Sequence, residues 1–258
     1  MATTAPHLDR FRVADCKPVF FMCVIGGRGT GKSTVMNHWV RALVGRIPKI
    51  IVFSATEPCN KFWSGKAPPN AVFSRLSEAH LLAVLEAQKQ SVQPDDPMHK
   101  NGLLIVLDDT AFDKGFLNSG VMKQLAMNGR HSNISVMMSV QYVMSCSIEL
   151  RSQMDYVVLC RTPQSNLRKR LWENYFGVVD SLQEFEALCR KYTSNHSTLV
   201  LHCTSTHNDL SKCVYWFRAM ANVPKYKFGS KSFRKAMRHA RRKRAEGPGN
   251  NDEVMTLG

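Results

Sequence analysis

The chain has 258 residues, of which 44% are hydrophobic and 21% charged, and its formal net charge is +15. This length suits one large domain, and the balance of apolar and charged residues excludes a wholly disordered chain. The longest apolar run, Val19–Ile25, is far shorter than the roughly 20 residues of a membrane-spanning helix. With no secretory signal at the start, we expect a soluble intracellular protein whose eight cysteines are reduced thiols.

Short β-rich runs alternate with helical stretches along most of the chain, a pattern typical of a mainly parallel sheet flanked by helices. We expect strands at Val19–Ile25, Lys49–Ser54, Leu103–Leu107, Ile134–Val140, Tyr156–Cys160, Thr198–Cys203 and Cys213–Phe217. We expect helices at Lys32–Val44, Glu78–Gln90, Val121–Met127 and Asn166–Tyr175. The last two strands should form an antiparallel hairpin that closes the sheet. The predicted organisation is an extension over residues 1–18, an α/β domain over 19–224 and a basic tail over 225–258.

A phosphate-binding loop follows the first strand. Residues 26–33 read GGRGTGKS and match G-x-x-x-x-G-K-[ST], in which glycines allow successive backbone N–H groups to face a phosphate. Lys32 would neutralise the β- and γ-phosphates of ATP, and the Ser33 hydroxyl would bind Mg²⁺. The N-terminus of the following helix adds positive potential. We therefore predict nucleotide contacts from Gly26, Gly27, Arg28, Gly29, Thr30, Gly31, Lys32, Ser33 and Thr34.

Two carboxylates follow the strand that begins at Leu103, in the sequence LLIVLDD. Ligand sites of α/β proteins form at the carboxyl ends of parallel strands, so both acids should face the nucleotide. We assign Asp108 to the Mg²⁺ ion and Asp109 to the activation of water, a pairing that favours hydrolysis. Gln141, directly after the next strand, is a candidate for sensing the γ-phosphate or orienting water.

Phosphoryl transfer also needs a cation that neutralises charge in the transition state, often an arginine from a neighbouring subunit. Two arginines are candidates for this role. Arg130 lies in NGRH before the strand that starts at Ile134, and Arg151 lies in ELRSQMD. Either could instead form a structural ion pair.

The chain resembles one family in the combination of five segments: GGRGTGKS, LLIVLDD, NGRHSNISVMMSVQY, LRSQMDYVVL and WENYFG. The chain is similar, over residues 20–218, to the genome-packaging ATPases of nucleocytoplasmic large DNA viruses, a branch of the FtsK–HerA group of DNA-pumping motors. The phosphate loop is shared with many unrelated proteins. The order and spacing of the acidic pair, the Asn-Gly-Arg-His segment and the Val-Gln-Tyr strand end are more specific.

The resemblance implies a RecA-like core with an extra strand between the phosphate-loop strand and the acidic-pair strand. It also implies a homo-oligomeric ring around double-stranded DNA, ATP hydrolysis that drives DNA into a preformed capsid, and partners at the capsid or at an inner-membrane packaging vertex. Such a protein would reside in host cytoplasmic viral factories and in the virion. Many members end the acidic strand with Asp-Glu, whereas this chain has Asp108 and Asp109, so the base function rests on a shorter side chain.

The net charge points to a polyanionic partner, and nearly half of it lies after Pro224. Ten Lys or Arg and no acid lie between Lys225 and Arg244, with a basic helix expected from Lys231. Double-stranded DNA is the favoured ligand of this tail; a nuclear-import signal or a membrane contact are alternatives. Two further candidate DNA contacts combine aromatic and basic residues: Phe112, Lys114 and Phe116 in one loop, and Lys61, Phe62, Trp63 and Lys66 in another.

Two other classes of protein are compatible with a phosphate loop. A nucleoside or nucleotide kinase would need an acceptor pocket and a lid, and it would leave the acidic pair and the basic tail unexplained. A helicase or DNA-transfer ATPase remains an alternative, although helicases generally carry a second core.

Overall fold

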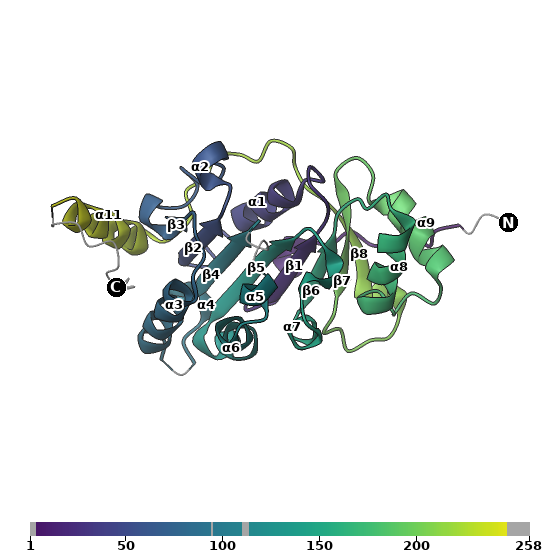
Figure 1. Cartoon of the computed structure of the whole chain (residues 1–258), viewed down its shortest axis with the longest axis horizontal. Coiled ribbons are helices and arrows are strands. Elements are labelled where there is room, and N and C mark those ends of the chain that lie inside the picture. Colours follow the sequence, from purple (N-terminus) through teal and green to yellow (C-terminus); the bar gives the residue numbers. More distant parts are fainter. Residues whose placement is uncertain (1–3, 94, 110–113, 247–258) are drawn as a thin grey trace.

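The computed structural model describes residues 4–93, 95–109 and 114–246 and contains one eight-stranded sheet. The strand order is β3-β2-β4-β5-β1-β6-β7-β8 (Figure 1). The strands are β1 (Phe21–Ile25), β2 (Lys49–Ser54), β3 (Val72–Phe73), β4 (Leu103–Asp108), β5 (Ile134–Val140), β6 (Tyr156–Leu159), β7 (Ser197–His202) and β8 (Val214–Arg218).

Six strands, from β3 to β6 in the sheet, are parallel, whereas β7 and β8 each run antiparallel to the preceding neighbour. Every residue of β1, β2, β4 and β5 is buried, which explains why these segments are mainly apolar. Strand β5 lies between β1 and β4, which confirms the extra strand expected between the phosphate loop and the acidic pair. The antiparallel pair at the end of the sheet is confirmed as well.

Helices flank the sheet, with α1 on one side and α3 and α6 on the other (Figure 1). The helices are α1 (Lys32–Ala42), α2 (Glu57–Asn60), α3 (Glu78–Ser91), α4 (Met98–Asn101), α5 (Lys114–Leu117), α6 (Gly120–Asn128), α7 (Ile148–Ser152), α8 (Ser165–Asn174), α9 (Leu182–Tyr192), α10 (Leu210–Cys213) and α11 (Lys231–Glu246). Serine side chains cap α3, α6, α7 and α9 by accepting a backbone N–H of the first turn. Helix α9 and the two-residue strand β3 were not predicted from the sequence.

The N-terminal segment packs against the domain. Leu8 and Phe11 are buried, and the Phe11 ring stacks on Trp39 of α1. The Phe11 N–H donates to the carbonyl of Trp216 in β8 at 2.8 Å. The segment expected as an extension thus contributes side chains to the hydrophobic core.

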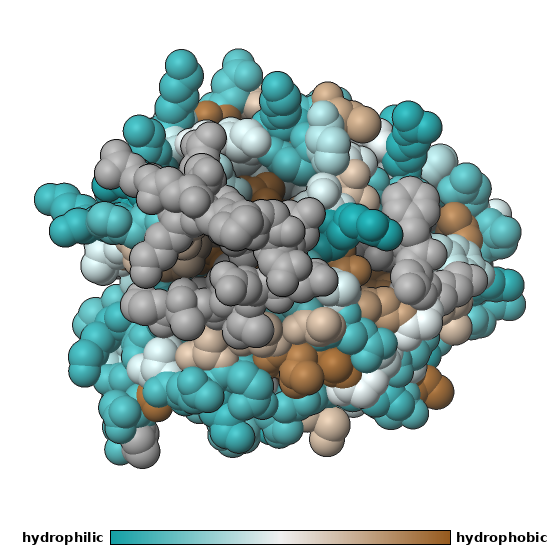
Figure 2. Space-filling model, turned by 60° about the vertical axis from the view of Figure 1, so that its left-hand side comes forward, coloured by the Kyte–Doolittle hydropathy of each residue, from teal (hydrophilic) through white to brown (hydrophobic). Residues whose placement is uncertain are grey.

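The C-terminal segment crosses to the opposite end of the sheet, where α11 lies beside β3 (Figure 1). Phe228, Phe233 and Met237 are buried there, and α11 contacts the short turn Pro69–Ala71. Figure 2 brings this end forward, and the residues that its colour scale covers are mostly hydrophilic. The basic helix expected from Lys231 is confirmed. Among the described residues, no helix has both the length and the apolar character to span a membrane.

Candidate nucleotide-binding and catalytic site

The phosphate loop connects the C-terminal end of β1 to the start of α1. Two of its glycines adopt the left-handed backbone conformation, Gly29 with φ of 75° and Gly31, at the N-cap of α1, with φ of 91°. Glycine adopts this conformation without the steric cost that other residues incur. These glycines therefore give the loop the tight curvature expected of a phosphate cradle.

Lys32 is 8% exposed and extends back over the loop, where its ammonium donates to the Gly27 carbonyl at 3.0 Å. The Thr30 hydroxyl donates to the same carbonyl at 2.8 Å. The positive charge of Lys32 is thus held at the cradle and away from bulk water. This arrangement fits the β- and γ-phosphates of a nucleotide.

Asp108, at the end of β4, is 2% exposed and is surrounded by hydrogen-bond donors. The hydroxyls of Ser33 and Ser139 donate to its Oδ1 at 3.2 and 3.1 Å, and the Trp63 indole N–H donates to its Oδ2 at 2.9 Å. Burial raises the pKa of Asp108, and the three hydrogen bonds oppose that shift. The adjacent oxygens of Ser33 and Asp108 fit the preference of Mg²⁺ for oxygen ligands.

Asp109 has a left-handed backbone with φ of 55°, which an aspartate tolerates better than most residues. Its N–H donates to the Ser139 hydroxyl at 2.9 Å, and its Oδ1 accepts the Gln141 amide N–H at 2.7 Å. The structure thus brings both acids, Gln141 and Ser33 together at the carboxyl edge of β4, β5 and β1. Strained backbone of this kind is common at functional sites.

Two neighbouring cavities open beside the loop. One, of about 270 Å³, is lined by Ile25, Gly26, Gly27, Arg28, Thr30, Gln141, Arg161, Thr162, Pro163, Gln164, Leu167 and Leu171. The other, of about 500 Å³, is lined by Arg28, Gly29, Thr30, Arg161, Pro163, Thr193, Asn195, His196 and Ser197. Arg161 borders both cavities and is exposed, next to the end of β6.

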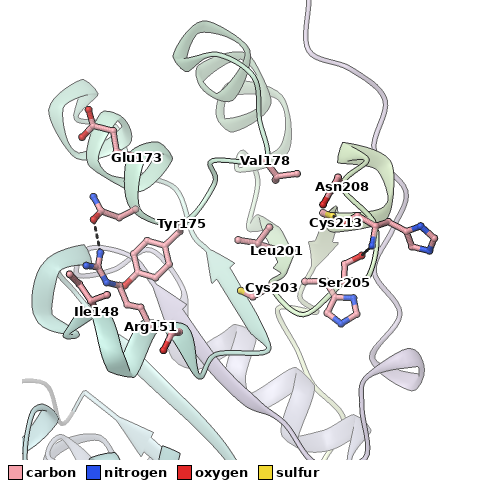
Figure 3. Close-up of a pocket in the computed structure, with 14 residues that line it drawn as sticks. Ile148, Arg151, Glu173, Tyr175, Val178, Leu201, Cys203, Ser205, Asn208 and Cys213 are labelled. Atoms are coloured by element: carbon pink, nitrogen blue, oxygen red, sulfur yellow. Dashed lines mark hydrogen bonds between the residues drawn. The ribbon is translucent and has the colours of Figure 1, made fainter.

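The two arginines expected to act across a subunit interface lie elsewhere. Arg130 is exposed in the turn Gly129–Ser132 that precedes β5, at the sheet edge opposite the phosphate loop. Arg151 is on α7, beside a separate cavity of about 610 Å³. Its guanidinium donates to Asn174 Oδ1 at 2.6 Å and lies 5.6 Å from the Tyr175 ring centroid (Figure 3). Within one subunit, neither residue joins the acidic pair.

The structure corrects part of the prediction that two loops contact DNA. Phe112 lies outside the described residues, whereas Phe116 is 6% exposed and packs in the core. Trp63 is fully buried, so its assignment to a DNA-contacting surface is wrong. Lys66 places its ammonium 3.9 Å from the Phe62 ring centroid. Phe228 and Phe233 in the tail are also buried, so these two rings pack against the domain.

Three residues of this site, Ser139, Arg161 and Trp63, were not predicted to belong to it from the sequence. Ser139 is a polar residue at the otherwise apolar end of β5. This polar position in the sequence indicated a possible site residue. Arg161 follows a buried strand, as Gln141 does, and the same reasoning would have found it. Trp63 had no such signal, because its contact with Asp108 depends on the path of the chain after β2.

The chain is similar in sequence to a family of viral proteins and to individual viral relatives. The family model described as "Poxvirus A32 protein" matches residues 9–212. An uncharacterized protein of Invertebrate iridescent virus 3, 088R, is 27% identical over 214 residues, which cover 82% of this chain and 81% of the relative. An uncharacterized protein of Acanthamoeba polyphaga mimivirus, L437, is 26% identical over 218 residues, covering 82% of this chain and 76% of the relative.

Among solved structures, the genome packaging NTPase B204 of Sulfolobus turreted icosahedral virus 2, in complex with AMPPCP, is similar with a TM-score of 0.55. The two are 15% identical, and the match covers 80% of this chain and 100% of the other. The pCW3 conjugation coupling protein TcpA, with ATPgS, matches with a TM-score of 0.52 and 11% identity over 86% of this chain and 65% of the other. These likenesses confirm the expected P-loop NTPase fold of the RecA-like type.

Proposed function

Because the chain belongs to the Poxvirus A32 protein family, we propose that it is an ATP-hydrolysing motor that translocates double-stranded viral DNA into a preformed capsid. The observation that carries this proposal is the convergence of the phosphate loop, the acidic pair and Gln141 at one sheet edge. The name of the structural relative B204, a genome packaging NTPase, supports the same cargo.

In this proposal the loop residues Gly26 to Thr34 bind the phosphates of ATP, and Lys32 neutralises the β- and γ-phosphates. Ser33 and Asp108 hold a Mg²⁺ ion, which supplies further charge neutralisation during phosphoryl transfer. Asp109 accepts a proton from the attacking water, and Gln141, which already donates to the Asp109 carboxylate, orients that water.

The DNA contact is assigned to α11. Its buried side is formed by Phe233 and Met237, while Lys231, Lys235 and Arg238 are exposed. A helix anchored by apolar residues presents its cations in a fixed arrangement, so phosphates can be contacted independently of base sequence. This fixed set of exposed cations supports DNA as the ligand.

We further propose that the subunits form a ring and that DNA stimulates hydrolysis. Arg130 is the favoured trans-acting arginine, and Arg151 is the alternative. The capsid or an inner-membrane packaging vertex would dock the ring, and host cytoplasmic viral factories and the virion would be its locations.

The test is steady-state phosphate release with and without double-stranded DNA. DNA should raise the rate, and Lys32→Ala and Asp109→Asn should abolish it. Transfer of the phosphoryl group to an added nucleoside, with no release to water, would overturn the proposal in favour of a kinase.

A second experiment addresses the arginine. Subunits with Arg130→Ala and subunits with Lys32→Ala are each expected to be inactive alone. When mixed, a ring that places a wild-type arginine beside a wild-type phosphate loop should recover part of the rate. Mixed rings that form but recover no activity would exclude Arg130, and the same mixture with Arg151→Ala would then be tried.

A further inference from the structure

Trp63 contacts Asp108 from the loop that follows α2, away from both the sheet and the phosphate loop. Its side chain is fully buried, and its indole N–H donates to Asp108 Oδ2 at 2.9 Å. The two serine hydroxyls both donate to the other oxygen, Oδ1. The indole therefore fixes the rotation of the carboxylate about its own axis, which decides the direction in which its oxygens face a bound cation.

The loop that carries Trp63 is itself held in place by a buried carboxylate. Glu57 is 8% exposed, and its two oxygens accept the backbone N–H groups of Trp63 and Ser64, each at 2.8 Å. The Trp63 carbonyl accepts the Lys66 N–H at 3.1 Å. The indole is thus attached to a loop with little freedom to shift independently.

The same loop is hydrogen-bonded to residues 228–230, the segment just before α11, which we call the α11 root. The Lys66 carbonyl accepts the Phe228 N–H at 2.7 Å, and the Ser230 N–H donates to the Pro48 carbonyl, just before β2, at 2.8 Å. The Phe228 side chain is fully buried. A continuous set of hydrogen bonds therefore runs from Asp108 through Trp63 and Lys66 to Phe228, shortly before the basic helix.

We propose that Trp63 is a positioning residue for the metal-binding carboxylate Asp108, and that docking of the α11 root through Phe228 sets its position. This inference rests on the proposed function and explains how the basic helix is connected to the nucleotide site. Partners that orient a metal-binding side chain typically change metal affinity by about 10–100-fold when they are removed.

The first test measures Mg²⁺ dependence of nucleotide binding and needs no turnover. A fluorescent ATP analogue is titrated into the full chain at increasing MgCl₂, with EDTA as the metal-free reference. Trp63→Phe keeps the aromatic ring and removes the N–H, so the half-saturating Mg²⁺ concentration should rise about tenfold. The affinity for the analogue in EDTA should stay unchanged, which also shows that the variant is folded.

Trp39→Phe is the matched control. Trp39 is another fully buried tryptophan, on α1, and its indole nitrogen has no hydrogen-bond partner in the described part of the chain. This substitution should leave the Mg²⁺ midpoint unchanged. If Trp63→Phe lowers the melting temperature but leaves the midpoint unchanged, Trp63 has a structural role alone and the proposal fails.

The second test is a double-mutant cycle between Trp63→Phe and Phe228→Ala. If Phe228 acts through Trp63, Phe228→Ala alone should raise the Mg²⁺ midpoint severalfold, and the double variant should match Trp63→Phe within about twofold. Fold-changes that multiply in the double variant would overturn the connection to α11.

These tests separate failure of the inference from failure of the proposed function. A chain that binds nucleotide with the expected Mg²⁺ shifts but releases no phosphate on DNA would retain the positioning role of Trp63 and contradict the motor. A DNA-stimulated ATPase whose Mg²⁺ midpoint is unchanged by Trp63→Phe would support the motor and contradict the positioning role of Trp63.

Discussion

The space around Gly26 allows a sharp prediction about the phosphate loop. A Cβ added at Gly26 would lie 2.5 Å from the Thr30 Oγ1 and 2.7 Å from the Cys160 Cβ. The hydroxyl can rotate away, but the Cys160 Cβ is fixed to the backbone. Both backbones are tied to the sheet, since the Gly26 N–H donates to Val140 O at 3.1 Å and the Cys160 N–H to Ile25 O at 2.8 Å. Neither side of this contact can move without breaking a hydrogen bond of the sheet.

Gly26→Ala should therefore destabilise the protein by about 1–3 kcal/mol, the usual range for overpacking a close-packed site. For a domain of this size, each kcal/mol lowers the melting temperature by roughly 2–4 °C. Thermal unfolding monitored by circular dichroism measures the shift. The variant should also bind the fluorescent ATP analogue more weakly, because the loop moves away from β6.

Gly27→Ala is the control for stability. A Cβ at Gly27 would lie 3.8 Å from its nearest neighbour, the Thr30 Cγ2, which is an ordinary contact. Its melting temperature should stay within about 1–2 °C of the wild type, as for a surface substitution. Equal losses in the two variants, or no loss in Gly26→Ala, would refute the reasoning from steric contact.

Two further predictions concern charge. Because burial raises the pKa of Asp108, stability from its neutral form is fully present below the unfolded pKa of about 3.9 and is lost as pH rises through the higher folded value. Without Mg²⁺, the melting temperature of the wild type should therefore fall relative to that of Asp108→Asn as the pH rises from about 4 to neutral; a difference that does not change with pH would mean that the hydrogen bonds offset burial. On α11, replacing Lys231, Lys235 and Arg238 by Gln should weaken DNA binding and reduce the slope of log affinity against log salt by up to about 2.7, measured by anisotropy with a duplex. An unchanged slope would move the DNA contact away from this helix.

Much of the fold could be predicted from local signals. Strands β2 and β5 have the predicted boundaries, because a strand buried on both faces reads as a mainly apolar run with abrupt ends. Helix α9 was missed although its pattern is strongly amphipathic, with Phe185 and Leu188 buried beneath charged residues. The position of β5 between β1 and β4 was expected from the resemblance and not from the spacing of elements, since local patterns do not encode which distant strands pair.

The candidate site likewise contains residues that local sequence predicts and residues that only tertiary packing places there. Lys32, Asp108 and Gln141 were found because each stands at a fixed offset from a strand, where chain position and spatial position coincide. The contact of Trp63 with Asp108 joins residues 45 positions apart. It arises from a loop whose path is set by Glu57 and by the returning C-terminal segment. Contacts of this kind depend on tertiary packing, so no sequence window contains them.

The position of Arg130 constrains how the proposed motor can use it. Strand β5 has seven residues and separates the turn of Arg130 from Gln141. At about 3.3 Å per residue, this strand spans about 23 Å, which exceeds the reach of an arginine side chain. A subunit therefore cannot bring Arg130 to its own γ-phosphate while the sheet is intact. If this arginine takes part in hydrolysis, the phosphate that it contacts belongs to another subunit, and recovery of activity on mixing is the outcome that the geometry requires.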